Sequence, residues 1–258
     1  MIVYKYLHPD RVDVLETGTI RFTQSAALND PFETHPCFTE LEDSFRKRQQ
    51  AIVDRQQLSR DAYVLASLTI PKRVKQGIER FKDQISNELC ILSLTTRRNN
   101  LLMWSHYTAA HRGFVIGFDF GHPFFAGKSS TFITPLTSVQ YSNKRRMCPG
   151  IERVRESLKE LADAVIFNKS EHWAYEEEYR MVSHPKRADR CLTVSGGQNI
   201  YLYSFPSEAL REIIFGHLMS KHLRNRIREI ASEGYPSVEL FDAHLSKTDF
   251  DLEIRRLK

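Results

Sequence analysis

The sequence of 258 residues is poor in cysteine, and its four cysteines lie far apart along the chain. They form no C-x-x-C pair, so neither a disulfide framework nor a zinc knuckle is indicated. His106 and His111 are separated by five positions, as are His217 and His222. Two imidazoles share a helix face when they are four positions apart, so these pairs do not suit a metal. We therefore expect reduced thiols and no metal site.

The sequence also lacks any long apolar run. No stretch approaches the roughly 20 consecutive apolar residues that a membrane span needs, and the first ten residues lack a charged head followed by a long apolar segment. Repeats, low-complexity tracts and composition shifts that would mark a linker are absent as well. With 41% hydrophobic and 27% charged residues, the composition is that of an ordinary globular protein. We expect a cytoplasmic protein without a membrane partner, folded as a single domain over residues 1–258.

The formal net charge of +5 shows a modest excess of basic residues. They gather at Arg46–Arg48, Arg97–Arg98 and Lys144–Arg146. Such an excess attracts the phosphates of nucleotides or nucleic acid, although it more often marks a solvated surface. Nucleic acid and a protein acceptor are both candidate partners, and the sequence leaves the oligomeric state open.

Hydrophobic periodicity predicts an α+β fold. Strands are expected at 2–7, 19–23, 89–95, 113–120, 137–141, 178–183, 200–205, 212–215, 238–243 and 250–255. Helices are expected at 10–17, 99–110, 151–169 and 219–232, with Gly18 as a left-handed cap. A helical insertion is expected at about 40–88, where Pro71 separates two helical stretches.

Leu28–Glu33 (LNDPFE) is the first of three motifs that carry candidate functional residues. Pro31 fixes its own φ and forces Asp30 into an extended conformation, so the segment is predicted to be a rigid turn. A purely structural turn would require neither Phe32 nor Glu33. We therefore keep Asn29, Asp30 and Glu33 as candidate pocket residues beside the structural interpretation.

The second motif is Met103–Tyr107 (MWSHY). A helix places Met103 and Tyr107 on one face with Trp104 beside them, whereas His106 points elsewhere. Met, Trp and Tyr at this spacing more often belong to a core than to a pocket. Trp104 and His106 are candidate pocket residues under the alternative interpretation.

The third motif is Tyr175–Arg180 (YEEEYR). If it enters a strand, Glu176, Glu178 and Arg180 share one face because residues two apart point the same way. Two neighbouring carboxylates repel, which raises the pKa of one of them, and Arg180 can offset this by pairing with one. An acidic strand edge that faces water is the alternative. The position of the motif between Trp173 and an apolar strand favours a functional role.

These motifs, with YKY near the start and IIFG at 213–216, resemble the bacterial domain-of-unknown-function 2971 family. The run NDPFE, the run MWSHYTAAHRGFVIGFD and the pattern W-x-Y-E-x-E-Y-R at Trp173–Arg180 follow one another in the family's order. The resemblance covers nearly the whole chain. The family carries no activity by name.

The order of elements also resembles the ADP-ribosyltransferase fold. The order is strand, helix, Gly, strand, then a Ser/Thr-bearing strand, a helix, a strand and finally Glu-x-Glu. The resemblance implies split antiparallel β-sheets with NAD in the cleft between them. In that group the second Glu of a [Gln/Glu]-x-Glu motif contacts the nicotinamide ribose and stabilises an oxocarbenium-like centre. By position this residue is Glu178.

The resemblance implies catalytic roles for Glu178 and Glu176. Cleavage of the N-glycosidic bond of NAD builds positive charge on the ribose, which a placed carboxylate stabilises. Glu176 would orient or deprotonate the acceptor. The group usually carries an Arg or His on its first strand, where this chain has Tyr4, Lys5, Tyr6 and His8. The cofactor-binding candidates are Tyr4, Tyr6, His8, Ser93, Thr95, Tyr107, which would stack on nicotinamide, and Arg180.

Three hypotheses about function follow. The first is an NAD-dependent ADP-ribosyltransferase-like effector, a toxin or anti-phage defence protein, that uses NAD as substrate and modifies nucleic acid or protein. The second is a nuclease-like effector that uses Glu33, Glu176 and Glu178 with a divalent metal. The third is a non-catalytic nucleotide or nucleic-acid sensor with an aromatic-lined pocket.

Overall fold

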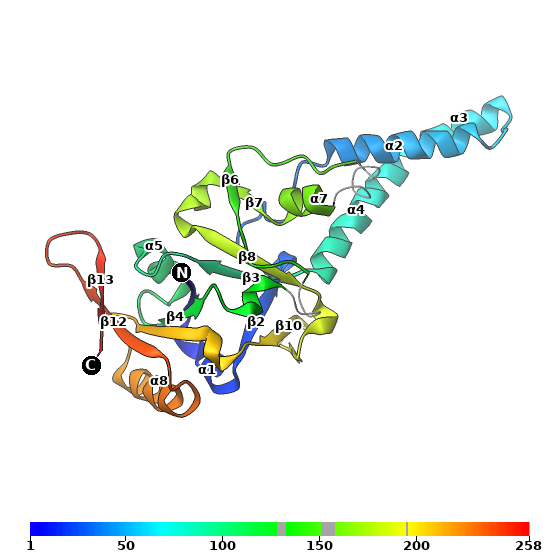
Figure 1. Cartoon of the computed structure of the whole chain (residues 1–258). Coiled ribbons are helices and arrows are strands. Elements are labelled where there is room, and N and C mark those ends of the chain that lie inside the picture. The colour runs from blue at the N-terminus through cyan, green and yellow to red at the C-terminus, as the bar shows by residue number, and fades with distance from the viewer. Residues whose placement is uncertain (128–132, 151–157, 195, 258) are drawn as a thin grey trace. The chain divides into compact units, whose positions relative to one another are not determined.

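The computed structural model describes residues 1–127, 133–150, 158–194 and 196–257 (Figure 1). The fold is α+β, as predicted, and combines helices with an 11-stranded mixed sheet and a two-stranded parallel sheet. The chain divides into two compact units. Unit 1 comprises Met1–Thr23, Cys90–Ser138 and Ala174–Lys258, and unit 2 comprises Gln24–Leu89 and Val139–Trp173. No helix in the described ranges is long and apolar enough to cross a membrane.

Unit 1 is built around the large sheet, whose main path is β13-β12-β11-β4-β1-β3-β2-β10-β9. Its strands are β1 (Ile2–Leu7), β2 (Thr19–Gln24), β3 (Cys90–Thr95), β4 (Phe114–Asp119), β5 (Thr137–Ser138), β8 (Glu178–Ser183), β9 (Arg190–Thr193), β10 (Asn199–Ser204), β11 (Leu210–Phe215), β12 (Glu239–Leu245) and β13 (Leu252–Arg256). β11 and β12 pair in parallel, and the helix α8 (Lys221–Gly234) connects them. β8 pairs antiparallel with both β3 and β5.

The central strands of unit 1 bury both of their faces. β4 lies between β1 and β11, and its residues 114–118 are all buried. On β1, Val3 belongs to one hydrophobic cluster, whereas Tyr4 and Tyr6 belong to a second cluster with Trp104 of α5 (Leu101–Tyr107). This division follows from the two-residue period of a strand. The nearly continuous apolar sequence of β4 therefore suits a strand covered on two sides.

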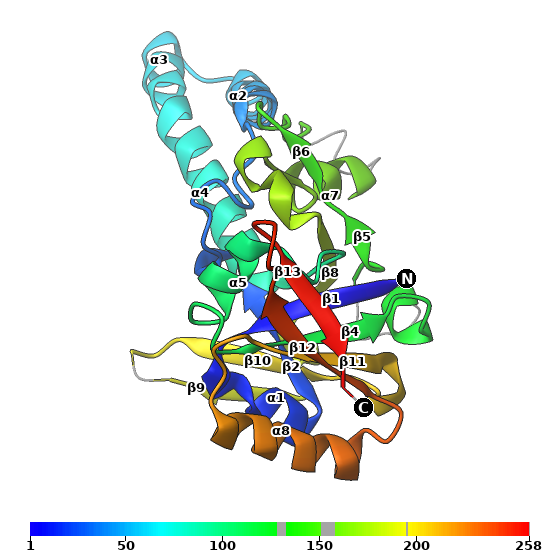
Figure 2. The ribbon, with the colours of Figure 1, turned by 90° about the vertical axis from the view of Figure 1, so that its left-hand side faces the viewer.

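The first helix of unit 1, α1 (Asp13–Thr17), ends at Gly18, which has a φ of 62°. The predicted left-handed cap at this position is confirmed, and glycine adopts it without steric cost. α1 and α8 lie side by side, as both views show (Figure 2). The Tyr235 hydroxyl, just after α8, donates a hydrogen bond of 2.9 Å to the Leu15 carbonyl and joins the two helices.

Unit 2 consists mainly of helices with the small sheet of β6 (Gln140–Ser142) and β7 (Asn168–Ser170). Its helices are α2 (Thr39–Asp54), α3 (Arg60–Leu68), α4 (Ile70–Glu88) and α7 (Leu158–Val165). α2 packs against α4 and forms two small cores with it, one around Leu41 and Ile78 and one around Val53 and Val74. Pro71 lies in the first turn of α4, where its missing N–H has no intrahelical partner to lose.

The structure differs from the prediction at several elements. The strand expected at 137–141 is divided into β5 and β6, which belong to different sheets. The helix expected at 99–110 ends at Tyr107, because residues 109–111 adopt left-handed φ angles. The helix expected at 151–169 is observed only as α7, since β7 begins at Asn168 and residues 151–157 lie outside the described ranges. β9 was not predicted, because all four of its residues are exposed and carry no hydrophobic alternation.

Candidate functional site

Three neighbouring strands of unit 1 carry the polar residues that the sequence singles out. Tyr4 of β1 pairs with Thr95 of β3, and Thr95 pairs in turn with Glu178, the first residue of β8. Ser93 pairs with Arg180 on the same two strands. The YKY strand, the LCILSLT strand and the strand that starts at Glu178 are therefore adjacent in the sheet.

Glu178 and Arg180 form a buried ion pair with two contacts. Arg180 Nε donates to Glu178 Oε1 at 2.8 Å, and Arg180 Nη2 donates to Glu178 Oε2 at 3.0 Å. The Arg180 side chain is 0% exposed and that of Glu178 is 4% exposed. The two residues share a strand face, as predicted. Because Glu176 and Glu178 are each 4% exposed, the alternative of an acidic strand edge facing water is wrong.

Glu176 lies just before β8, at the end of a 3₁₀ turn that spans Glu171–Glu176. The Tyr107 hydroxyl donates a hydrogen bond of 2.6 Å to Glu176 Oε1, and the Thr95 hydroxyl donates to the Glu176 carbonyl. Glu177, which separates the two buried carboxylates, has a φ of 42°. This left-handed conformation is unusual for a residue with a long side chain and stores backbone strain.

Lys5 contributes the second cation near these carboxylates. Its Nζ donates a hydrogen bond of 2.9 Å to the Ser93 carbonyl. Burial lowers the pKa of Lys5 to about 8, while the charges of Glu178 and Glu176 act in the opposite direction. We refer to Lys5, Glu176, Glu178 and Arg180, with Thr95 beside them, as the carboxylate cluster. Two formal positive and two formal negative charges make this cluster balanced when Lys5 is protonated.

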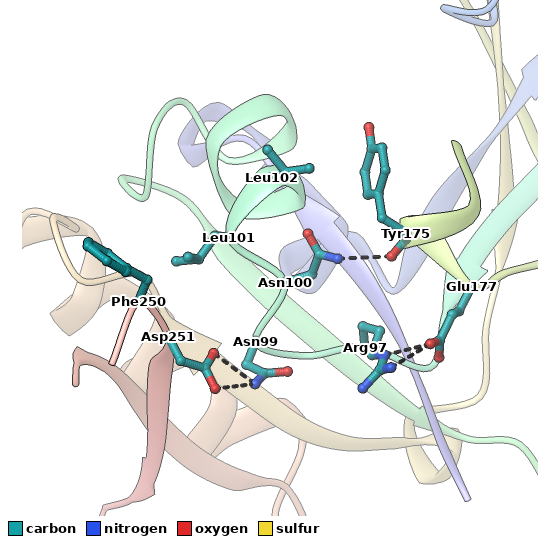
Figure 3. Close-up of a pocket in the computed structure, with 9 residues that line it drawn as sticks. All are labelled: Arg97, Asn99, Asn100, Leu101, Leu102, Tyr175, Glu177, Phe250 and Asp251. Atoms are coloured by element: carbon teal, nitrogen blue, oxygen red, sulfur yellow. Dashed lines mark hydrogen bonds and ion pairs between the residues drawn. The ribbon is translucent and has the colours of Figure 1, made fainter. Parts of the chain in front are cut away.

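A cavity of about 410 Å³ adjoins the same chain segments in unit 1 (Figure 3). The residues that line this Arg97 cavity are Arg97, Asn99, Asn100, Leu101, Leu102, Tyr175, Glu177, Phe250 and Asp251. Its volume is typical of a site for a small molecule. The cavity thus lies between the start of α5 and the Tyr175–Arg180 motif. Glu177 is the carboxylate of this motif that lines it.

Hydrogen bonds hold the wall of the Arg97 cavity. Arg97 Nε donates to Glu177 Oε1 at 2.7 Å, and the Thr96 hydroxyl donates to Glu177 Oε2 at 2.7 Å. The Thr96 hydrogen bond is the largest cause that lowers the pKa of Glu177; burial opposes it, and the hydrogen bond and charge of Arg97 lower the pKa further. Asn100 Nδ2 donates to the Tyr175 carbonyl at 2.9 Å, and Figure 3 shows both groups turned toward each other.

Side chains of the core fix the loop that precedes α5. The Tyr6 hydroxyl donates to the Arg97 carbonyl at 2.9 Å, and Trp104 Nε1 donates to the Arg98 carbonyl at 3.0 Å. Asn100 Oδ1 accepts from the Met103 amide at 3.1 Å and so caps the helix. Trp104 is fully buried, which agrees with the core interpretation of the second motif.

The structure brings only part of the predicted site together. Lys5, Ser93, Thr95, Tyr107, Glu176, Glu178 and Arg180 meet at or next to the carboxylate cluster. Tyr4 instead donates a hydrogen bond of 3.1 Å to Glu212, and burial followed by the Glu212 charge raises the pKa of Tyr4 to about 12. His8 is exposed and caps a short 3₁₀ helix, and His106 is exposed on α5.

The remaining candidates, Asn29, Asp30 and Glu33, belong to unit 2. Asp30 Oδ1 accepts a hydrogen bond of 2.9 Å from the Phe32 amide, and the Glu33 amide donates to the Asp30 carbonyl at 3.1 Å. The predicted turn is therefore confirmed. Glu33 forms a buried ion pair of 3.1 Å with Lys169, and Asn29 is exposed.

Arg97, Asn100 and Glu177 line the cavity and were not among the candidates. Two signals in the sequence pointed to them. Arg97 belongs to a basic pair that directly follows a buried strand, and Asn100 is a preferred capping residue at the start of a helix. Nothing in the sequence distinguishes Glu177 from its two neighbours. Within the described ranges, no three His, Cys, Asp or Glu side chains are grouped so that they could hold a metal ion.

The fold and the carboxylate cluster define an α+β protein with a buried, charge-balanced site on a mixed sheet. Residues 103–181 match the model of the family described as "Protein of unknown function (DUF2971)". The match includes the Met103–Tyr107 and Tyr175–Arg180 motifs and confirms the predicted family resemblance over these residues. Comparison with curated proteins and with solved structures gives no match.

Proposed function

We propose that unit 1 acts as an NAD-dependent ADP-ribosyltransferase-like enzyme that modifies nucleic acid or protein. The observation that carries this proposal is the row of Tyr4, Thr95 and Glu178 across β1, β3 and β8, with Glu176 two residues before Glu178. A Glu-x-Glu pair at the start of a strand beside a Thr-bearing strand is the arrangement that the resemblance implies.

The pairing of β3 supports a divided sheet of this type. β3 meets β1 through one register pair, Tyr4 with Thr95, whereas it follows β8 over six pairs, from Cys90 with Ser183 to Thr95 with Glu178. The strands β8 and β5 therefore leave the main path of the sheet at β3. Such a division provides two groups of strands that can border a substrate.

The chemistry of the carboxylate cluster suits glycosyl transfer. As the bond between C1′ of the ribose and the nicotinamide nitrogen breaks, its electron pair leaves with nicotinamide, and positive charge grows on the ribose. Arg180 holds the Glu178 carboxylate in one orientation, so this carboxylate stabilises the charge without reorganisation. Glu176 accepts the proton of the attacking hydroxyl or amine as the new bond to C1′ forms.

The residues around the Arg97 cavity suit part of a dinucleotide. Arg97 would share its cation between Glu177 and a phosphate, and Tyr175 offers a ring for stacking. The amide nitrogens of Asn99 and Asn100 would have to turn from Asp251 and the Tyr175 carbonyl to reach ribose hydroxyls. Glu176 and Glu178 are each 4% exposed, so the ribose reaches them only after the strained turn at Glu177 opens. The proposal therefore includes a movement of this turn.

A non-catalytic nucleotide sensor is the second candidate. This candidate is favoured because both buried carboxylates already have protein partners: Arg180 binds Glu178, and Tyr107 binds Glu176. A sensor would use the Arg97 cavity for binding and the buried cluster for stability alone. The transferase would release nicotinamide from NAD, whereas the sensor would bind the nucleotide without any reaction.

The test measures nicotinamide released from NAD by the full-length protein, with nucleic acid or cell extract supplied as acceptor. We expect release with the native chain and loss of release in Glu178→Gln, compared at a temperature at which thermal melts show both to be folded. Glu208→Gln, at an exposed position of unit 1, is the matched control and should retain release. NAD binding without release would favour the sensor, and neither binding nor release with any acceptor would overturn both candidates.

A further inference from the structure

Unit 2 contains a cavity of about 300 Å³ that none of the functions above uses. It lies between the turn that begins at Asp30, the basic loop around Lys144 and the strand β7. Its lining contains three cations, Lys144, Arg145 and Lys169, against one carboxylate, that of Asp30. All residues of this basic cavity belong to unit 2, so an inference from it stands apart from the proposal for unit 1.

Two of the cations are available to a ligand. Lys144 and Arg145 have no ion pair with any residue that the structure describes. The Lys144 amide donates to the Ser142 hydroxyl oxygen at 3.0 Å, and the Ser142 hydroxyl donates to the Lys144 carbonyl at 2.9 Å. The backbone of the loop is thus fixed locally, and the exposed side chains of Lys144 and Arg145 line the cavity. Arg145 Nη1 also donates a hydrogen bond of 3.5 Å to the His35 carbonyl, so a phosphate would share this guanidinium with it. Cations on an ordered loop suit a phosphate.

An aromatic ring stands beside these cations. Phe32 is 60% exposed, and the Arg145 guanidinium lies 5.8 Å from the centre of its ring. The turn that carries Phe32 is held by the Asp30 side chain and by Pro31. An exposed ring on a rigid turn loses little conformational freedom when a planar group stacks on it.

Lys169, which lines the cavity, belongs to a buried ion pair whose other member, Glu33, does not line it. Lys169 Nζ lies 3.1 Å from Glu33 Oε1, and the two side chains are 3% and 2% exposed. Lys169 Nζ also lies 4.9 Å from the centre of the Trp173 ring. A buried ion pair often stabilises a fold no more than apolar residues of the same volume would. Lys169 is held by Glu33 and Trp173, and a ligand phosphate would therefore meet Lys144 and Arg145.

We infer that the basic cavity binds a nucleoside monophosphate unit, with its phosphate at Lys144 and Arg145 and its base stacked on Phe32. The unit has two sources, a free nucleotide or one residue of a single-stranded nucleic acid. Stacking on an aromatic ring beside a positively charged groove is a common mode of single-strand recognition. The volume of the cavity is at the lower end of the range for small-molecule sites and suits one such unit.

The experiment titrates the full-length protein by calorimetry with AMP, with adenosine and with a single-stranded oligoadenylate. We expect AMP to bind and adenosine to bind at least tenfold more weakly, because adenosine lacks the phosphate. Oligoadenylate binding that is far tighter than AMP binding, and that weakens with salt, would identify nucleic acid as the source. Equal affinities would identify the free nucleotide. Absence of binding by both AMP and oligoadenylate at millimolar concentration would overturn the inference.

Variants distinguish binding in this cavity from non-specific binding of the nucleotide to basic residues on the surface. Phe32→Ala should weaken binding by about tenfold, and Phe32→Leu, which keeps apolar volume but removes the ring, should weaken it similarly. Lys144→Ala should also weaken binding and should reduce the salt dependence for the oligonucleotide. Lys47→Ala removes the same charge from an exposed position on α2 and should leave binding unchanged. If Lys47→Ala weakens binding as much as Lys144→Ala does, or if Phe32→Ala has no effect, the assignment fails.

Discussion

Arg180 and Glu178 form a deeply buried ion pair in unit 1. The free energy of this pair determines how much stability the protein loses when either residue is substituted. We expect Arg180→Ala to lower the free energy of unfolding by about 3–5 kcal/mol, because it leaves the Glu178 carboxylate buried without its partner. Replacing both residues by leucine removes both charges together. The double variant should therefore be more stable than Arg180→Ala.

Urea unfolding measures both changes. Arg211→Ala, at an exposed position on β11, is the control for the loss of an arginine and should change the stability by less than about 0.5 kcal/mol. A double variant as unstable as Arg180→Ala would show that packing at this position, and not the stranded charge, sets the cost. Glu178→Gln removes the negative charge that pairs with Arg180, so this variant should lose stability for the same reason.

The burial of Lys5 predicts the sign of a pH dependence of stability. Its pKa falls from 10.5 in an unfolded chain to about 8 in the folded protein, mainly because of burial. Between these two pH values the unfolded chain binds more protons, so the contribution of Lys5 to stability rises with pH across this window. At about 1.4 kcal/mol per pKa unit, the gain is on the order of 3 kcal/mol at most.

Thermal melts of the native chain and Lys5→Met at pH 7.5 and pH 10 test this effect. The comparison is needed because burial raises the pKa of Cys90 to about 11, so that its ionisation weakens the fold at high pH in both proteins. We expect the native chain to gain stability relative to Lys5→Met as the pH rises. A constant difference between the two proteins would show that Lys5 titrates normally.

The connection between α5 and β4 depends on one glycine. A Cβ atom at Gly113 would lie 2.0 Å from the Leu7 carbonyl oxygen, which belongs to the neighbouring strand β1. Because that atom is backbone, it cannot move away without breaking the pairing of β1 with β4. We expect Gly113→Ala to lower the free energy of unfolding by at least about 3 kcal/mol, the upper end of the usual cost of overpacking.

The matched control is Gly234→Ala, at the last residue of α8. A Cβ atom there meets nothing within 4 Å, so this change should be neutral or slightly stabilising. Urea unfolding of the two variants gives the comparison. Equal stability of both variants would mean that β1 and β4 adjust to the added methyl group.

At the level of elements, the sequence predicted best where the signal is local. Gly18 ends α1, Pro71 stands in the first turn of α4, and Asp30 closes its turn as expected. Each of these features needs only neighbouring residues. The helix expected at 151–169 extended into Asn168 and Lys169, which carry no apolar signal of their own, and only pairing with β6 makes these residues part of a strand.

The whole chain contains two compact units, and each has a hydrophobic core of its own. The sequence predicts a single domain because its composition does not change along the chain. We expect Ile78→Ala to weaken unit 2 by about 2–5 kcal/mol, since Ile78 is 3% exposed in its core. The amides of β4 in unit 1 should keep their protection from hydrogen exchange in this variant.

Ile213→Ala, at a fully buried position of unit 1, is the matched change. It should reduce the protection of β4 and leave the amides of α4 in unit 2 protected. If each variant lowers protection throughout the chain, the two units unfold as one cooperative domain, and the expectation from the sequence is correct.

The sequence by itself determined the α+β class, the buried central strands and the three motifs. Apolar alternation, caps and turn residues act between residues that are close along the chain. It also indicated the pair of Glu178 and Arg180, because residues two apart on a strand share a face. The Met103–Tyr107 and Tyr175–Arg180 motifs carried the family resemblance over residues 103–181.

Only the tertiary structure decided which motif residues meet. Arg97 reaches Glu177 across 80 positions, Tyr107 reaches Glu176 across 69, and Lys5 reaches Ser93 across 88. Glu176, Glu177 and Glu178 are chemically equivalent in the sequence, yet two are buried and one lines a cavity. The left-handed turn at Glu177 and the pairing of β8 with β3 produce this difference. Both depend on contacts between segments that the chain brings together only when it folds.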